Sequence, residues 1–158
     1  MPYRAEEIVA GILIGFEGSF SGYIYILFPE HSAFQLADLL RCRMIGETKS
    51  IETEMEESAL METGNILASA FCDATADFLH FSLVPSPPSF AFDMVGAMIE
   101  YALIEPFRPR ETEHVILFEC AFQDSEERDF FGYLLFFPHP STLQWILSLL
   151  EKKLSEIR

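Results

Sequence analysis

The sequence has few positive charges and no long apolar run, and both absences exclude classes of partner. Ten lysines and arginines stand against 25 aspartates and glutamates, which gives a formal net charge of −15 at pH 7. Nucleic-acid backbones and anionic membrane surfaces are bound by clustered lysine and arginine, so we expect neither as a partner. No apolar stretch reaches the ~18 residues of a membrane span. The first residues, MPYRAEEIVAG, also lack the basic start and long apolar stretch of a secretory signal.

The sequence also lacks the residue patterns of a disulfide framework, a metal site or a phosphate-binding loop. Its three cysteines, Cys42, Cys72 and Cys120, lie far apart and form no CxxC pair, which fits reduced thiols in the cytoplasm. The four histidines show no ligand spacing, and the acidic run DSEERD at 124–129 lacks the spacing of a calcium-binding EF-hand loop. No glycine-rich loop follows a predicted strand. We therefore expect a cytoplasmic protein with no metal or cofactor of its own.

The apolar content is high enough for one globular domain over residues 1–158, since half of the residues are hydrophobic. Apolar and β-branched runs predict strands at 6–16, 20–28, 79–84, 113–123 and 129–138. Helical periodicity predicts helices at 33–42, from Thr53 to about Phe78, at 92–106 and at 142–158. Ser32 and Ser141 are the expected caps of the first and last helix. The expected fold is α+β, a two-layer sandwich in which a largely antiparallel sheet of about five or six strands packs against helices.

Two stretches of the sequence resemble each other, which predicts an internal repeat. Residues 22–40 read GYIYILFPEHSAFQLADLL, and residues 132–150 read GYLLFFPHPSTLQWILSLL. Each copy closes a strand–strand–helix unit, so we expect two related units arranged about a pseudo-twofold axis. A long helix, a strand and another helix precede the second unit, but nothing comparable precedes the first. We therefore expect that a helix belonging before the first unit is absent here.

The helix that begins after Thr53 separates an apolar stripe from a polar one. Thr53 and Glu56 have the spacing of a capping box. At about 100° per residue, Ser58, Glu62 and Asn65 fall within an arc of roughly 60°. The far side of the helix carries Leu60, Gly64, Leu67 and Phe71. A glycine on this apolar stripe indicates that the helix closely approaches a strand or another helix.

A polar stripe on a helix is usually an ordinary solvated face, but this one also fits a longer pattern. Ser58, Glu62 and Asn65, followed after 22 further residues by Pro88, match [D/S]-x3-E-x2-N-x22-P. This pattern resembles the signature of the CheC/CheX/FliY family of chemotaxis phosphatases, and the flanking segments ESALMETGNILASAF, DATADFLHF and PSPPSFAFDM are similar as well. The resemblance runs from about residue 5 to residue 150 and is greatest to the CheC branch. In that branch an N-terminal helix typically carries a first copy of the motif, and we expect this helix to be absent here.

The resemblance implies a phosphatase of two-component signalling in chemotaxis. Its substrate would be the aspartyl phosphate of a CheY-type response regulator, which carries its own Mg²⁺. By resemblance, Glu62 and Asn65 would be catalytic: Asn65 would orient the attacking water, and Glu62 would pair with the active-site lysine of the regulator. Ser58 would support contact with the regulator, and Pro88 would shape the neighbouring loop. Because only one copy of the motif is present, we expect one active site.

Other functions remain open at this point. The chain could be a non-catalytic CheC-like adaptor that binds the receptor deamidase CheD or another signalling protein, through the predicted helix from about Asp93 to Glu105. It could also be a phosphatase-like scaffold for a regulator outside chemotaxis. A homodimer is a further expectation, because the missing helix could leave a sheet edge in need of cover.

Overall fold

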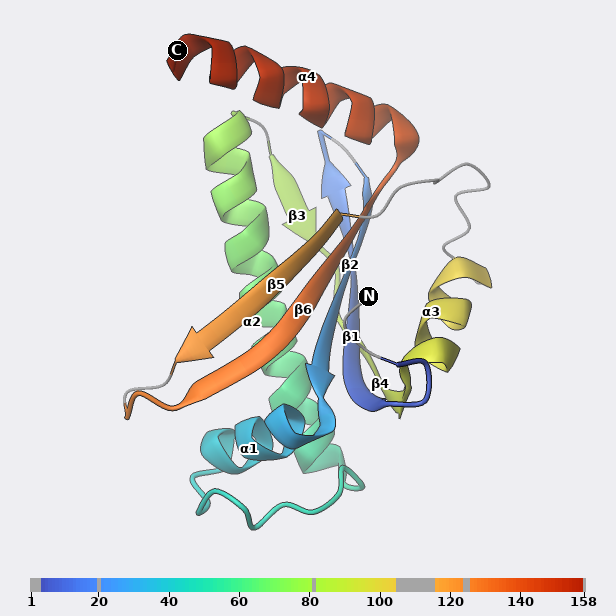
Figure 1. Ribbon diagram of the computed structural model, residues 1–158, viewed down its shortest axis with the longest axis vertical. Helices are drawn as coiled ribbons and strands as arrows, with labels where there is room; N and C mark the ends of the chain where they lie inside the picture. The colour runs from blue at the N-terminus through green and yellow to red at the C-terminus, as the bar shows by residue number, and fades with distance from the viewer. Residues whose placement is uncertain (1–3, 20, 81, 105–115, 124–125, 158) are drawn as a thin grey trace.

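The computed structural model describes residues 4–19, 21–80, 82–104, 116–123 and 126–157 of the chain (Figure 1). In chain order the elements are β1 (Ile8–Gly18), β2 (Gly22–Pro29), α1 (Glu30–Leu40), α2 (Glu54–Leu79), β3 (Leu83–Pro85), β4 (Ser89–Met94), α3 (Val95–Ile104), β5 (Ile116–Gln123), β6 (Asp129–Pro138) and α4 (Pro140–Ile157). Each predicted strand or helix region therefore overlaps an element of the predicted type, although the predicted strand at 79–84 does so only at 83–84, and the strand β4 was not predicted. The predicted helix end at 105–106 and strand start at 113–115 lie outside the described residues.

The strands form one six-stranded sheet in the order β3-β1-β2-β6-β5, with β4 also paired to β1. All pairings between these strands are antiparallel. β3 and β4 share β1 as their neighbour, since β4 pairs with residues 8–13 and β3 with residues 16–18. The loop at 86–88 that joins β3 to β4 therefore passes beside the middle of β1. The predicted α+β fold with a largely antiparallel sheet is confirmed.

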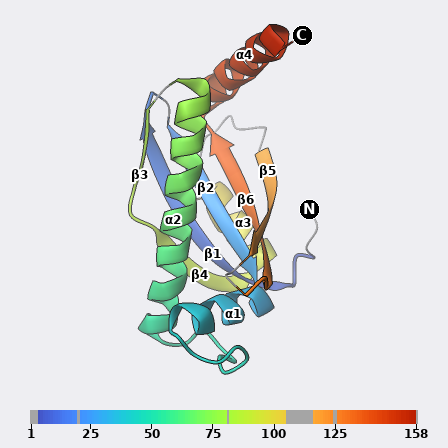
Figure 2. The same cartoon turned by 90° about the vertical axis from the view of Figure 1, so that its left-hand side faces the viewer.

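Different helices cover the two faces of the sheet. Ile12 and Ile14 of β1 belong to the larger core, to which α1 and α2 also contribute. Val9 and Leu13 alternate with them and face the other way, where Met98 of α3 joins the smaller core. Figure 2 shows α2 and α3 on opposite sides of the sheet. The layer formed by α1 and α2 is the one that carries the predicted site, and α3 adds cover to the second face.

The internal repeat appears as two units, β1–β2–α1 and β5–β6–α4. Their inner strands, β2 and β6, are antiparallel neighbours, with Gly22 opposite Pro138. The sequence repeat equates Gly22 with Gly132, an offset of 132 − 22 = 110 residues. The same offset separates Tyr25 from Leu135, which face each other in this pairing, so the pseudo-twofold axis passes between them. Figure 1 shows α1 and α4 at opposite ends of the sheet, as such an axis requires.

Three predicted helix starts are wrong. The helix α4 begins at Pro140, so Ser141 lies in its first turn and is not its cap. Asp93, expected near the start of a helix, lies instead in β4, where it is opposite Val9 of β1. This segment stays extended because β4 continues its ladder with β1 to the last residue of the strand, and α3 begins only at Val95. Ser32 does not cap α1, because the helix already begins at Glu30 and no side chain caps it.

Candidate functional site

The N-terminus of α2 is fixed by a buried carboxylate. The Thr53 side chain accepts from the backbone N–H of Glu56, and the Glu56 carboxylate accepts from the backbone N–H of Thr53 at 3.0 Å, so the predicted capping box is confirmed. The Glu56 carboxylate also forms a salt bridge with the guanidinium of Arg41, which precedes the helix in sequence. Burial alone would raise the pKa of Glu56, but the hydrogen bonds from Thr53 and Glu52 and the charge of Arg41 lower it below its ordinary value. The start of the helix is therefore held in one position.

The loop that leads into α2 is organised around a second buried carboxylate, Asp38 of α1. Asp38 accepts hydrogen bonds from the backbone N–H of Gly46 at 2.8 Å and of Thr48 at 2.9 Å, and from the Thr48 hydroxyl. Burial would raise the pKa of Asp38, yet these hydrogen bonds outweigh it and lower the pKa. Asp38 and Glu56 together connect α1, the loop and the first turn of α2.

The middle of α2 lies directly on β1 because position 64 has no side chain. A Cβ added to Gly64 would come within 2.6 Å of the Ile12 Cγ2 atom, so only glycine permits this approach. Leu60 and Ala68, one turn to either side, are fully buried. The close helix–strand contact that the sequence predicted is therefore confirmed, and it lies next to Asn65 in the chain.

Cys72 does not lie near the polar stripe, where an ideal helical wheel places it. Its side chain is fully buried and continues the apolar stripe of Leu60, Gly64 and Ala68. Burial, with the charge of Asp73, raises the pKa of the Cys72 thiol to about 11. The thiol is thus protonated near neutral pH, and it is not presented to a partner at the surface.

The outward face of α2 carries the three motif residues of the helix. Ser58 and Glu62 are exposed, and Asn65 is half-buried. Within the described part of the chain, none of their side chains has a hydrogen bond or an ion pair. Thr63 lies between Glu62 and Asn65 in the chain. Its hydroxyl instead donates a hydrogen bond to the Ala59 carbonyl at 3.1 Å. The helix therefore carries a carboxylate and the only asparagine of the chain, one turn apart, on its outward face.

Pro88 lies half-buried in the loop at 86–88, next to the strands on which α2 packs. This loop is held on β1 by two hydrogen bonds, from the Gly15 N–H to the Ser86 hydroxyl at 3.0 Å and from the Ser86 N–H to the Gly15 carbonyl at 2.8 Å. β1 thus supports both the middle of α2, through Ile12, and the loop of Pro88. Asp93 is exposed in β4 and does not belong to the outward face of α2.

Sequence reasoning missed Ile66, which is adjacent to Asn65. Its side chain is 57% exposed although it belongs to a helix with a well-covered apolar stripe. The available signal was its position about 40° from Glu62 around the helix, away from the buried stripe. The exposed Ile66 side chain adds an apolar group to the outward face of α2, next to Asn65 in the chain.

The described ranges contain neither a metal-ligand cluster nor a membrane-spanning helix. Within them, no three histidine, cysteine, aspartate or glutamate side chains gather as metal ligands do. Among the helices of the same ranges, none has both the length and the apolar character that crossing a bilayer requires.

Comparison with known proteins points to one family. The model of the CheC-like family matches residues 55–91, a range that contains the motif from Ser58 to Pro88. The CheY-P phosphatase CheC of Bacillus subtilis is 31% identical over 136 residues, which are 85% of this chain and 64% of that protein. The chain therefore spans less than two thirds of the length of this relative.

Solved structures show the same fold at low sequence identity. FliY from Thermotoga maritima is 14% identical, with a TM-score of 0.69 over 94% of this chain and 73% of the FliY chain. A chain of the CheX–CheY–BeF3–Mg²⁺ complex from Borrelia burgdorferi is 20% identical, with a TM-score of 0.52 over 87% of this chain and 86% of its own length.

The sheet order and the outward face of α2 thus define an α+β domain with the fold of the FliY and CheX structures. The family match and the Bacillus subtilis relative confirm the predicted resemblance to the CheC-like family.

Proposed function

We propose that the protein is a phosphatase that hydrolyses the aspartyl phosphate of a CheY-type response regulator in chemotaxis. The observation that carries this proposal is the pair Glu62 and Asn65, without partners in the described structure, on a helix fixed by Gly64 and Glu56. The name of the Bacillus subtilis relative, CheY-P phosphatase, supports the substrate. The Borrelia burgdorferi complex, in which CheX and CheY occur together, supports a regulator of this type as the partner.

Hydrolysis of an aspartyl phosphate requires an oriented water rather than a strong base. The water oxygen attacks phosphorus, the bond between phosphorus and the aspartyl oxygen breaks, and the carboxylate leaves with the electron pair of that bond. The Asn65 carboxamide is neutral at every relevant pH, and its oxygen accepts a water O–H so that a lone pair of the water points at phosphorus. Such positioning alone contributes several kcal/mol to lowering the barrier.

Glu62 acts in docking rather than in bond breaking. It projects about 4.5 Å along the helix axis from Asn65, one turn towards the N-terminus. We assign it to the active-site lysine of the regulator, because a carboxylate pairs with an ammonium group and this one has no cation of its own among the described residues. Mg²⁺, which this proposal places on the regulator, neutralises charge on the phosphoryl group.

The test is to follow loss of phosphate from a phosphorylated CheY-type regulator with and without the purified protein. The wild-type protein and Glu100→Gln, which changes an exposed carboxylate on α3 across the sheet, should both accelerate the loss. Asn65→Ala should remove most of the acceleration at every protein concentration, and Glu62→Gln should remove most of it at concentrations well below saturation. Equal decay with and without the wild-type protein would overturn the proposal.

An adaptor function is the second candidate, and exposed apolar side chains favour it. Large apolar residues are exposed on β5, β6 and α4: Leu117, Phe118, Phe131, Leu147 and Leu154. Such residues suit a protein partner, and a second copy of the chain is a candidate occupant. For CheD we keep the predicted region from about Asp93 to Glu105, whose described part includes α3. In a pure adaptor, the wild-type protein and Asn65→Ala would bind the partner alike, and neither would accelerate dephosphorylation.

A further inference from the structure

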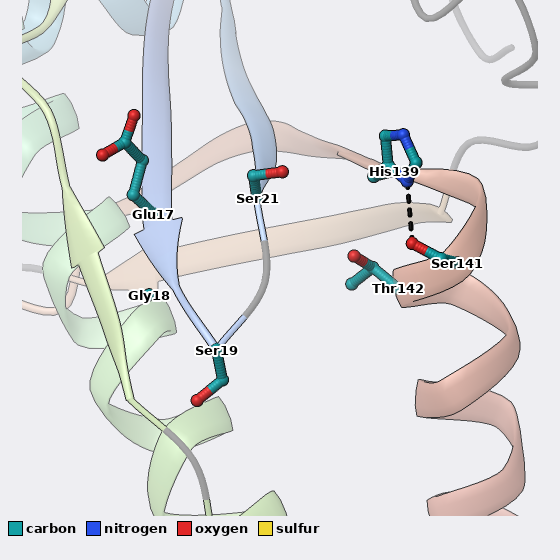
Figure 3. Close-up of a pocket in the computed structure, with 7 residues that line it drawn as sticks. All are labelled: Glu17, Gly18, Ser19, Ser21, His139, Ser141 and Thr142. Atoms are coloured by element: carbon teal, nitrogen blue, oxygen red, sulfur yellow. Dashed lines mark hydrogen bonds between the residues drawn. The ribbon is translucent and has the colours of Figure 1, made fainter.

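A pocket lies at the N-terminus of α4, separate from the outward face of α2. It is widely open to solvent and has a volume of about 540 Å³. Its walls are the end of β1 and the following turn, at 17–19 and 21, and the first turn of α4, with His139, Ser141 and Thr142 (Figure 3). α4 begins at Pro140, one residue before the predicted cap Ser141, so Ser141 and Thr142 both belong to its first turn.

Thr142 is a buried residue whose hydroxyl has no hydrogen-bond partner among the described residues. The residue is only 3% exposed, and no hydrogen bond to its side chain occurs in the described part of the chain. Figure 3 shows its hydroxyl directed into the space between α4 and the turn of Ser19. A buried hydroxyl without a partner destabilises a fold, so one that points into a pocket indicates a missing acceptor or donor.

The backbone of the same turn offers further donors. The N–H of His139 donates to the Ser21 carbonyl at 3.2 Å, and the N–H of Leu143 donates to the His139 carbonyl at 3.0 Å. Pro140 has no N–H, so the N–H groups of Ser141 and Thr142 are the free donors of the turn among the described residues. The Ser141 hydroxyl lies 2.8 Å from the His139 Nδ1 atom, which holds the imidazole over this end of the helix (Figure 3).

We propose that this pocket binds a phosphoryl-type oxyanion, either inorganic phosphate or the phosphate group of a small monoester. The Thr142 hydroxyl and the two free N–H groups supply donors to its oxygens, and the helix N-terminus favours negative charge. The Ser141 hydroxyl and the His139 imidazole flank them. The pocket is larger than a phosphate ion, so it also has room for the organic part of a monoester.

The negative charge of Glu17, which lines the pocket, should weaken the binding of an anion there. Removing this charge is a second test of the proposal. Its carboxylate is exposed, and in Figure 3 it points away from His139 and Thr142. The net charge of −15 acts in the same direction. Glu17→Gln should therefore tighten phosphate binding, most clearly at low ionic strength, where charges are least screened.

The experiment measures phosphate binding by calorimetry and by thermal unfolding, with chloride at the same ionic strength as the reference and without any response regulator. Thr142→Val keeps the shape of the side chain and removes the hydroxyl. It should weaken phosphate binding about tenfold or more, because a hydrogen bond to a charged group is lost. Without phosphate, Thr142→Val should unfold at the same temperature as the wild-type protein or a higher one, since it removes an unsatisfied group.

Two control variants test whether phosphate binds in this pocket or elsewhere on the protein. Thr75→Val removes a hydroxyl that already bonds to the Phe71 carbonyl on α2, and it should leave phosphate affinity unchanged. Asn65→Ala should also leave it unchanged, so the result does not depend on the proposed phosphatase site. Tighter binding of O-phosphoserine than of inorganic phosphate would identify a monoester, and equal binding would identify the free ion. Absence of saturable binding, or equal affinity in Thr142→Val and wild type, would overturn the proposal.

Discussion

Glu62 and Asn65 have no partner within the described structure, whereas Glu56 and Thr63 of the same helix are satisfied by the fold. Glu56, two turns earlier, is buried and accepts several hydrogen bonds, and Thr63 bonds back to the helix. A helix stabilised by its own contacts has no structural need for the two outward residues. Under the proposed function the two side chains serve a partner, and that partner is expected to present a cation and a phosphoryl group.

At the same scale, Glu62→Gln separates docking from catalysis. The amide keeps the size of the side chain but removes the charge that pairs with the lysine of the regulator. We expect the protein concentration for half-maximal dephosphorylation to rise about tenfold or more. The rate at saturating protein should change much less, because Asn65 is still present.

The measurement is dephosphorylation of the regulator over a range of protein concentrations, with Glu100→Gln as the charge-matched control. An unchanged half-maximal concentration in Glu62→Gln, or an equal shift in Glu100→Gln, would contradict the docking role.

The resemblance to the family pattern selected Ser58, Glu62, Asn65 and Pro88 as candidate site residues, because that pattern fixes identities at fixed intervals. It did not place Cys72 correctly. The buried stripe advances by four residues from Leu60 to Cys72, and each such step rotates the stripe by about 40° around the helix. The sheet beneath α2 is twisted, so a long helix that stays on it turns its covered face gradually. An ideal helical wheel cannot show this rotation.

At the scale of elements, the site depends on how closely α2 approaches β1. Gly64→Ala would add a methyl group against Ile12, and overpacking of this kind costs about 1–3 kcal/mol. Alanine recovers only about 1 kcal/mol of helix propensity. We therefore expect a lower free energy of unfolding and lower phosphatase activity, since the helix must move away from the strand next to Asn65.

Measuring Gly64→Ala in a second background, Ile12→Ala, tests whether the cost comes from the contact with Ile12. Ile12→Ala opens the space beneath position 64, so adding Gly64→Ala to it should raise the free energy of unfolding relative to Ile12→Ala alone. Urea denaturation of the four proteins in this cycle gives the coupling. An equal cost of Gly64→Ala in both backgrounds would show that the Ile12 contact does not determine the position of α2.

Element types were largely predictable, but their boundaries and faces were not. The segment SFAFDM at 89–94 is apolar and short, and sequence alone could not decide between a strand and the first turn of the next helix. In the structure the whole segment pairs with β1, and it is therefore a strand. The sequence pattern also could not predict that α3 lies on the second face of the sheet, because its apolar residues could pack on either face.

At the scale of the whole molecule, two buried carboxylates predict how stability depends on pH. The folded-state pKa values of Asp38 and Glu56 lie below their ordinary values of 3.8 and 4.5. Between the folded and the ordinary pKa the unfolded chain binds more protons, so acidification favours unfolding. The stabilisation is complete above the ordinary values and is lost as pH falls below them.

Asp38→Asn tests this prediction against the many other acids of the chain. At neutral pH the variant should be less stable than the wild type, because the charged acceptor of the Gly46 and Thr48 hydrogen bonds is gone. The difference in free energy of unfolding should narrow as pH falls below 3.8. Denaturant titrations at several pH values give this difference. A gap that stays constant or widens on acidification would contradict the depressed pKa.

The pseudo-twofold axis explains why one half of the molecule carries the candidate site. The units β1–β2–α1 and β5–β6–α4 are related, with Tyr25 opposite Leu135 at the axis. The helix α2 packs mainly on β1, β3 and β4, on one side of that axis, and its Phe71 ring also contacts Phe118 of β5 and Phe136 of β6. One motif copy on one helix thus predicts one regulator bound per chain. The ratio of regulator to protein in a purified complex measures this, and a ratio of two regulators to one chain would contradict it.

The central claim is that Asn65 orients the water that attacks a bound aspartyl phosphate. Its most direct test is the single-turnover decay of a phosphorylated CheY-type regulator fully bound to Asn65→Ala. We predict that the variant binds the regulator as the wild type does, while decay slows by about 100-fold or to the intrinsic rate of the regulator, whichever is faster. Decay at the wild-type rate in the saturated Asn65→Ala complex would contradict the claim.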